Sequence, residues 1–306
     1  MAFTAGIAKN GVGVDLAAAL LEANAKKANF LAIIGGLAGI AKANGRDFRT
    51  SVYDLGDAEN PGYVEGSDAP DAEHIARVGE AQVCEAFRQT LAVSDVEEAL
   101  SLNSGVSDVA SELAFQLKGH LKALANKINK SSVAGTYADG SLTPFKRKMR
   151  GIVNAITTNV VDAESAALTK ALLSKLAKAG YDANADGMFA MVCDSDMKTK
   201  IDALYEDNTK GSMTVAGVVL DTVNISPLKN VAIIIDNDVA AGTILLVDVD
   251  VCRLRGIRLD QFGGVYVYVK PLGSKGDYTA ALIEADLGLD YGTETKHAKM
   301  VNIATA

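Results

Sequence analysis

Residues 50–76 read TSVYDLGDAENPGYVEGSDAPDAEHIA, a stretch with many acidic residues and few apolar ones. It contains no lysine or arginine and seven carboxylates: Asp54, Asp57, Glu59, Glu65, Asp68, Asp71 and Glu73. Such a segment has too little apolar surface to fold on itself, and a structureless connection of this length is unusual inside a compact domain. Composition alone leaves two interpretations, which are a disordered acidic loop and a projecting arm ordered by another surface.

The segments on either side of the acidic stretch have different patterns. Residues 82–94, QVCEAFRQTLAVS, alternate with β character, as the return strand of an arm would. Residues 1–29 are rich in alanine, glycine and asparagine, and the helix predicted over 16–28 is too short to be stable alone. Residues 30–44 are apolar and interrupted by glycines, which predicts a segment packed under another surface.

The clearest helix follows the return strand. Apolar residues recur at steps of three and four, which places one stripe along a helix of about six turns. The stripe consists of Val106, Ala110, Leu113, Leu117, Leu121, Leu124 and Ile128. Ser107 or Asp108 is a candidate cap for its first turn. We interpret the stripe as core packing.

A basic cluster follows the next glycine-containing turn and comprises Lys146, Arg147, Lys148 and Arg150. The whole chain is acidic, with 30 lysines and arginines against 38 aspartates and glutamates and a net charge of -8. Proteins that grip nucleic-acid phosphates normally carry a basic surplus. We therefore interpret the cluster as a solvated or partner-facing surface.

The second half of the chain begins with helices and ends with strands. A helix is predicted over 163–179 with Asp162 as its cap and Gly180 as its stop. A buried strand over 188–193 and a helix over 197–205, capped by Asp194 or Ser195, follow. Further strands are predicted over 214–223, 231–236, 244–251, 265–269 and 280–289. This order indicates an α+β fold.

The residue types that carry chemistry do not assemble into a predicted site. Residues 182–187 (DANADG) resemble the first half of a calcium loop, but its twelfth position, which needs a bidentate carboxylate, is Cys193. Asp236 and Asp238 follow a predicted strand and are interpreted as turn residues. Asp248 and Asp250 lie two apart on one face of a predicted strand, where they would repel unless solvated or paired, and no His, Cys or basic residue is adjacent in sequence. The glycines at 11 and 13 lack the third glycine of a dinucleotide fingerprint. We predict no catalytic residue, cofactor or metal.

Two further classes of protein are disfavoured by simple counts. The three cysteines are far apart, so they form neither a disulfide framework nor a zinc cluster, and a reduced cytosolic setting is expected. The longest apolar run, residues 30–41, is shorter than the roughly 20 residues of a membrane span, and the N-terminus lacks the basic region of a signal peptide. We predict no association with a membrane.

The order of these segments resembles the Hong Kong 97-type fold of tailed-bacteriophage major capsid proteins, in the branch akin to the phage SU10 capsid family. The resemblance covers roughly residues 28–304. It is carried by RVGEAQVCEAFRQTLAVS at 77–94, ELAFQLK at 112–118, MRG at 149–151 with TN at 158–159, LT at 168–169, AGTILLVD at 241–248, and LGSKGD at 272–277 followed by Glu284 and HA at 297–298. The chain departs from the family pattern at Cys84 and Glu85, where more aromatic residues are usual.

The resemblance implies a division of the chain into four parts. Residues 1–44 would form an N-terminal arm and residues 45–97 an extended β-hairpin loop. Residues 98–159 and 252–306 would form the peripheral domain, which includes a long spine helix over 107–130. Residues 160–251 would form the axial domain.

The resemblance also implies a function. Copies of the chain would form hexamers and pentamers of an icosahedral shell, assembled in the host cytoplasm, around double-stranded DNA bound without sequence specificity. A separate scaffolding protein, a portal and in some cases a decoration protein would be partners. We hypothesise that the acidic residues from Asp54 to Glu73 meet Lys146, Arg147, Lys148 and Arg150 on an adjacent copy. Two alternatives remain, which are an encapsulin-like compartment shell and a cytosolic α/β enzyme or small-molecule binder.

Overall fold

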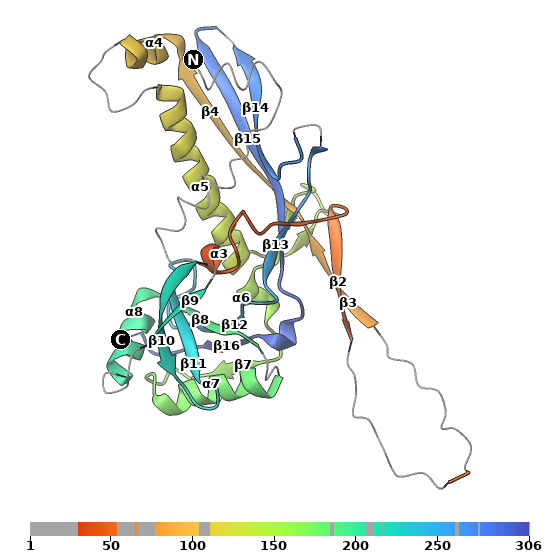
Figure 1. Cartoon of the computed structure of the whole chain (residues 1–306), viewed down its shortest axis with the longest axis vertical. Coiled ribbons are helices and arrows are strands. Elements are labelled where there is room, and N and C mark those ends of the chain that lie inside the picture. The colour runs from red at the N-terminus through yellow and green to blue at the C-terminus, as the bar shows by residue number, and fades with distance from the viewer. Residues whose placement is uncertain are drawn as a thin grey trace.

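The structure is a computed structural model of the 306-residue chain. It describes all residues except 1–29, 54–64, 67–76, 104–110, 184–186, 206–210, 216, 261–262, 275 and 306. Two sheets dominate it: one runs beside a long helix, and the other forms a separate lobe with two helices packed against it (Figure 1). The observed mixture of helices and sheets agrees with the α+β class that the sequence predicts.

The first sheet is organised around one long strand, β15 (Tyr278–Asp290). Strand β4 (Glu85–Ser94) pairs with it antiparallel along one edge. Strands β14 (Val267–Ser274) and β13 (Arg253–Gly256) pair antiparallel along the other edge, and β1 (Ala41–Lys42) extends the sheet from β13. Because side chains alternate across a strand, β15 has one apolar face, and its other face carries carboxylates at positions 284, 286 and 290.

The long helix α5 (Glu112–Ala134) lies along this sheet (Figure 1). Every described member of the predicted stripe is buried, which confirms its packing role: Leu113, Leu117, Leu121, Leu124 and Ile128. The helix begins later than predicted, because the Ser111 hydroxyl accepts the amide of Ala114 and caps the first turn. Residues 106–110, which include the candidate caps Ser107 and Asp108, lie outside the described residues. The helix also ends four residues later, since Ser132 and Val133 are buried too.

The second sheet has seven strands of mixed direction. Their order is β7 (Val160–Asp162), β16 (Ala298–Val301), β12 (Ile244–Asp248), β8 (Phe189–Cys193), β11 (Asn230–Ile235), β10 (Val218–Asn224) and β9 (Gly211–Val215). Helices α7 (Lys170–Ala183) and α8 (Ser195–Leu204) pack on one face. All residues of β8 and β12 are buried, as expected for central strands covered on both sides.

One core joins the two sheets. Alternate residues of the central strands, such as Ala190 and Val192 of β8, pack with the stripe of α5 and the apolar face of β15. Residues between them, such as Phe189 and Met191, pack under α7 and α8 instead. The short helix α3 (Phe30–Ile33) is completely buried in the shared core, which confirms the predicted packed segment at its start.

The helix predicted over 163–179 is shifted in the structure. Asp162 ends strand β7 and does not cap a helix, and α7 begins only at Lys170. Gly180 lies inside α7 and does not stop it. A Cβ at Gly180 would lie 2.6 Å from Cδ2 of Leu246, so this glycine allows the helix to approach strand β12 closely. The next helix, α8, starts two residues before the predicted 197, and its predicted cap is confirmed because the Asp194 carboxylate accepts the amide of Met197 at 2.9 Å.

Several strands differ from the prediction. The run over 214–223 is a hairpin of β9 and β10 with Gly217 in its turn, at a φ of +83° that favours glycine. The run over 82–94 is divided at Cys84 between β3 (Arg77–Val83) and β4, which belong to different sheets. Strands β13 and β16 are short and were not predicted. The resemblance assigns residues 252–306 to the peripheral domain. Strand β16 of that segment nevertheless lies in the second sheet, whose other strands all come from residues 160–251.

Buried His297 gives the fold a pH dependence. Its Nδ1 accepts the amide of Asp248 at 3.2 Å, and its Nε2 lies 2.8 Å from the carbonyl of Tyr291, which requires a neutral ring that donates from Nε2. Burial lowers the pKa of His297 below its usual value of 6.5. Below that pH the unfolded chain binds a proton that the folded chain does not, so stability falls as the pH falls.

We expect His297→Gln to reduce the loss of unfolding free energy between pH 7 and pH 5 relative to the unchanged chain. Urea unfolding of dissociated subunits at several pH values measures it. The control is His120→Gln, which changes the same residue type on a half-buried site of α5. Equal pH dependence of the unchanged chain and His297→Gln would show that this ring does not contribute.

Candidate subunit interface

A two-stranded hairpin of β2 (Asp47–Tyr53) and β3 carries the acidic stretch. The pairing runs from Asp47 opposite Val83 to Tyr53 opposite Arg77, and it leads away from the body of the molecule (Figure 1). Within the described residues, β2 and β3 pair with no other strand. A lone hairpin of this kind is marginally stable in water, and its open edges favour pairing with another surface.

The base of the hairpin is attached to the first sheet. Thr50 donates its hydroxyl to Asp290 at 2.7 Å, and Tyr291 donates its hydroxyl to Glu80 at 2.6 Å. Gly288 leaves room for the Phe48 ring, since a Cβ there would lie 2.8 Å from the ring. Burial raises the pKa of Asp290, but hydrogen bonds from Thr50, Arg255 and an amide outweigh it and hold the pKa below its usual range. The hairpin therefore leaves the body at a defined place.

Of the seven predicted acidic residues, the structure describes one. Glu65 lies in an exposed turn with Gly66. The remaining six, Asp54, Asp57, Glu59, Asp68, Asp71 and Glu73, lie outside the described residues.

A basic groove of about 770 Å³ lies between α5, β4 and the segment around β6 (Arg147–Lys148). Six cationic side chains line this groove: Arg88, Lys127, Lys130, Lys146, Arg147 and Lys148. Glu85 is the one acidic side chain among its lining residues. Burial raises the pKa of Glu85, and the amide of Met149 and nearby lysines oppose that rise. The groove is therefore a strongly positive surface, suited to an acidic partner.

The cations of the groove differ in how they are neutralised. Arg88 lies 2.7 Å from Glu284, and Arg147 lies 3.9 Å from Asp286. Within the described part of the chain, the groove lysines at positions 127, 130, 146 and 148 have no ion-pair partner within 4.0 Å. These lysines, all exposed, are the ones available to a second chain.

The structure separates the predicted basic cluster into two groups. Lys146, Arg147 and Lys148 line the groove. Arg150 points elsewhere: its guanidinium lies 4.8 Å from the centre of the Tyr137 ring and donates to the Tyr291 hydroxyl at 3.4 Å. Sequence reasoning missed Arg88, Lys127 and Lys130. Lys127 and Lys130 are three apart on the exposed face of α5, but only the tertiary packing brings that face beside β6.

Two large apolar side chains project near the groove. Leu142 is 80% exposed and Phe145 is 69% exposed, and both lie in the loop between β5 (Ala138–Asp139) and β6. Phe145 also lines the groove. Exposed apolar side chains beside a polar rim are typical of a surface that another protein covers.

The described residues offer little for other chemistry. Within them, His, Cys, Asp and Glu form no group of three that could hold a metal ion. Asp182 lies in α7 and Cys193 in β8, while residues 184–186 of the calcium-like motif lie outside the described part. Strand β12 ends at Asp248, whose carboxylate accepts the amide of Asp250 at 3.1 Å in the following turn, so these two residues do not share a strand face as predicted. Among the described helices, none combines the length and apolar character that a membrane crossing requires.

A family model described as SU10 major capsid protein matches residues 2–304. A search of curated proteins finds no significant match.

Solved structures with the same fold come from several sources. The chain is similar to the capsid of cyanophage A-1(L), with a TM-score of 0.69 at 11% identity, covering 91% of this chain and 93% of that one. It is also similar to the capsid of a native GTA particle (TM-score 0.60, 12% identity, 88% and 89% covered). The holo-SrpI encapsulin complex of Synechococcus elongatus gives a TM-score of 0.63 at 12% identity, with 88% and 86% covered. At these identities the likeness shows the shared fold.

Proposed function

This chain belongs to the SU10 major capsid protein family, and from that premise we propose that its copies assemble through contact between the acidic stretch, residues 50–76, of one subunit and the basic groove of the next. It is a major capsid protein of a tailed bacteriophage, a structural component of the virion and not an enzyme. The encapsulin alternative shares the fold, but the family match favours the phage shell.

The proposal extends to the architecture of the shell. We expect hexamers and pentamers in a closed icosahedral shell around double-stranded DNA, assembled in the host cytoplasm. A scaffolding protein, a portal and a decoration protein are expected partners. The net charge of -8 supports a container that does not adhere to its genome.

We also propose the four-part division of the chain, with two additions from the sheet pairing. Residues 1–44 form the arm at the N-terminus, 45–97 the extended loop, 98–159 with 252–306 the peripheral domain, and 160–251 the axial domain. Strand β4 of the loop segment belongs to the first sheet, and β16 of the terminal segment completes the sheet of the axial domain.

The observation that carries the proposed contact is the charge complementarity within one chain. Seven carboxylates occupy residues 54–73, and the groove presents four exposed lysines without an ion-pair partner among the described residues. Strands β2 and β3 extend away from the body, and the acidic stretch connects their ends, so we expect a neighbouring copy to supply the surface for it (Figure 1). Each exposed pair contributes only about 0.2–1 kcal/mol, so assembly depends on many such pairs repeated around the shell.

We expect the double substitution Lys146→Glu and Lys148→Glu to weaken association between subunits by about tenfold or more, because it removes attraction and adds repulsion. Arg147 is left unchanged because it is only about one-fifth exposed and lies beside Asp286. Sedimentation velocity at low and high salt measures the effect, which should shrink as salt screens the charges.

The matched control is Lys175→Glu with Lys178→Glu. These two exposed lysines of α7 carry the same charge change away from the groove. If both double variants assemble alike, with the same salt dependence, the groove is not the surface that binds the acidic stretch.

A further inference from the structure

The turn between β5 and β6 exposes the large apolar side chains of Leu142 and Phe145. The amide of Phe145 donates to the carbonyl of Leu142 at 2.6 Å, which closes the turn. Phe145 has a φ of +56°, a left-handed conformation that bulky residues rarely adopt. Residues held in such conformations are concentrated at functional sites. The turn therefore presents an apolar surface whose exposure does not stabilise the isolated subunit, and we searched the described residues for a site that accepts it.

A cleft of about 620 Å³ lies beside strand β2. Thr50, Ser51 and Tyr53 of that strand line one side, and residues of the segments 250–253 and 290–296 line the other. Because neighbouring residues of a strand point to opposite faces, a cleft that contacts both Thr50 and Ser51 runs along the edge of β2. That edge is open, since β2 pairs only with β3 among the described strands. The Tyr53 ring is 59% exposed at the border of this cleft.

The turn and the cleft have complementary charges next to them in sequence. Tyr53 is followed directly by Asp54, the first carboxylate of the acidic stretch. Phe145 is followed directly by Lys146, the first cation of the basic cluster. A pairing of Asp54 with Lys146 would bring the two aromatic residues within reach of each other, because consecutive Cα atoms are only about 3.8 Å apart. The apolar contact would then adjoin the charged contact.

Tyr53 and the turn lie apart within one subunit. Tyr137 and Asp139, which precede the turn, line a small cleft together with Asp47 at the start of β2. Tyr53 lies at the other end of β2, six residues further along an extended strand, or roughly 20 Å. We therefore expect the contact between Tyr53 and the turn to form between two copies of the chain and not within one.

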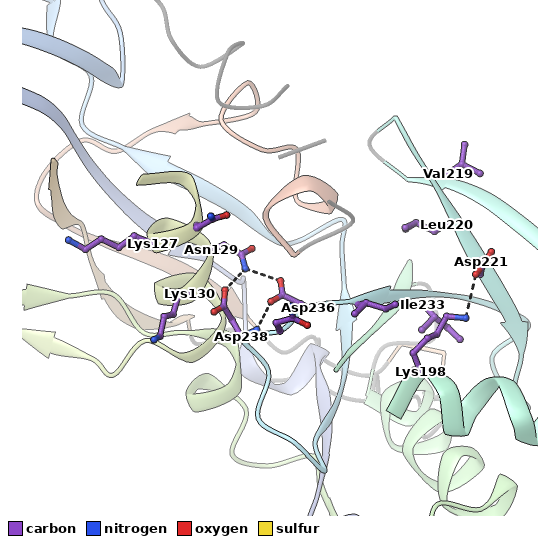
Figure 2. Close-up of a pocket in the computed structure, with 13 residues that line it drawn as sticks. Lys127, Asn129, Lys130, Lys198, Val219, Leu220, Asp221, Ile233, Asp236 and Asp238 are labelled. Atoms are coloured by element: carbon purple, nitrogen blue, oxygen red, sulfur yellow. Dashed lines mark hydrogen bonds and ion pairs between the residues drawn. The ribbon is translucent and has the colours of Figure 1, made fainter. Parts of the chain in front are cut away.

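A larger cleft, of about 830 Å³, is lined by residues of α5, β10 and β11 (Figure 2). Its central polar groups already bind one another, since Asn129 donates to the carboxylates of Asp236 at 2.9 Å and Asp238 at 2.7 Å (Figure 2). This cleft belongs to the lobe of the second sheet, whereas the cleft beside β2 is continuous with the acidic stretch through Tyr53. The cleft beside β2 is therefore the better site for the turn.

We propose that Leu142 and Phe145 of one subunit bind against Tyr53 and the cleft beside β2 of the next subunit. This inference rests on the proposed function, because it places the apolar contact next to the charged one. Aromatic contacts that are shielded from water contribute more to association than solvated pairs of charges, which is why they form the hot spots of interfaces. The turn would thus anchor the next subunit, while the surrounding charges orient it.

Cross-linking between two singly substituted chains tests this contact. Full-length Tyr53→Cys and Leu142→Cys subunits are purified separately, mixed and assembled, so that a short bismaleimide can join these two positions only between subunits. We expect a covalent dimer on a denaturing gel, with the link identified by peptide mass spectrometry. The native cysteines do not compete, because burial raises the pKa of Cys84 and Cys193 to about 12 and that of Cys252 well above its usual value.

The matched control mixes Tyr53→Cys with Val219→Cys, which replaces an exposed apolar residue of β10. This mixture should give no link between the two positions. Equal linking in both mixtures, or no link between Tyr53 and Leu142 in assembled shells, would overturn the proposal.

The strength of association gives a second readout that needs no cysteine. In Leu142→Ser with Phe145→Asn the apolar contact is lost, and asparagine tolerates the left-handed conformation at position 145. We expect association to be about tenfold weaker or more, at low and high salt alike, because salt does not screen apolar burial. Urea unfolding of dissociated subunits should be unchanged, since both side chains are exposed. Unchanged association would contradict the proposal.

The same measurement separates this inference from the proposed function. If Lys146→Glu with Lys148→Glu weakens assembly and Leu142→Ser with Phe145→Asn does not, the charged contact stands and the apolar contact is wrong. If only Leu142→Ser with Phe145→Asn weakens assembly, the apolar contact stands and the groove is not the partner of the acidic stretch.

Discussion

We expect a chain in which an Asn-Gly turn replaces residues 54–76 to form no shells but still to fold. Tyr53 and Arg77 are directly opposite in the hairpin register, and Asn-Gly is the preferred two-residue connection between such strands. The replacement removes all seven carboxylates at once. The attachments of the hairpin to the body, Thr50 to Asp290 and Tyr291 to Glu80, lie outside the replaced residues and stay intact.

Electron microscopy and sedimentation measure this result, and circular dichroism with hydrogen exchange of β15 verifies folding. A second variant distinguishes the loss of charge from the loss of the segment itself. It keeps residues 54–76 but converts the seven carboxylates to their amides. We expect intermediate loss of assembly from that variant, because its apolar and backbone contacts remain. Shells of normal diameter from the Asn-Gly variant would show that residues 54–76 are not required for assembly.

Gly151→Ala should destabilise the subunit by about 3 kcal/mol, near the upper end of the usual cost of overpacking. A Cβ at Gly151 would lie 2.4 Å from the amide nitrogen of Gly135 and 2.6 Å from the carbonyl oxygen of Val133. Both are backbone atoms, so no side chain can turn aside. The amide of Gly151 also donates to the carbonyl of Gly135 at 2.8 Å, so a displaced chain loses that hydrogen bond as well.

The matched control is Gly119→Ala, in the exposed part of α5. A Cβ there meets no atom within 4 Å, so the change should stabilise the helix by about 0.5–1 kcal/mol. Urea unfolding of dissociated subunits measures both variants. The same methyl group should thus have opposite effects at the two glycines. A Gly151→Ala subunit as stable as the unchanged chain would contradict the tight packing after α5.

Local patterns predicted those elements that depend on local chemistry. The stripe from Leu113 to Ile128 identified α5, and Asp194 identified the start of α8, because periodicity and capping act within a few residues. The start of α5 was misplaced because Ser107 and Ser111 are equally good caps by type. Glu98 selects Ser111 by accepting its hydroxyl at 2.7 Å and the amide of Leu113 at 2.9 Å, a tertiary contact that sequence does not display.

Other elements depend on partners far along the chain. Gly180 has the composition of a helix stop, yet it is a helix-interior residue because Leu246 approaches it. Strand β16 has only four residues and is recognisable only through its neighbours β12 and β7. The candidate interface follows the same rule: the cluster at 146–148 was visible in sequence, whereas Arg88, Lys127 and Lys130 join it through packing.

The most direct test of subunit assembly is negative-stain electron microscopy of the purified chain together with sedimentation velocity, over a range of protein and salt concentrations. We predict rings or closed shells of uniform size that dissociate as salt rises. A 31.9 kDa monomer under every condition, with residues 45–80 protected from hydrogen exchange, would contradict it.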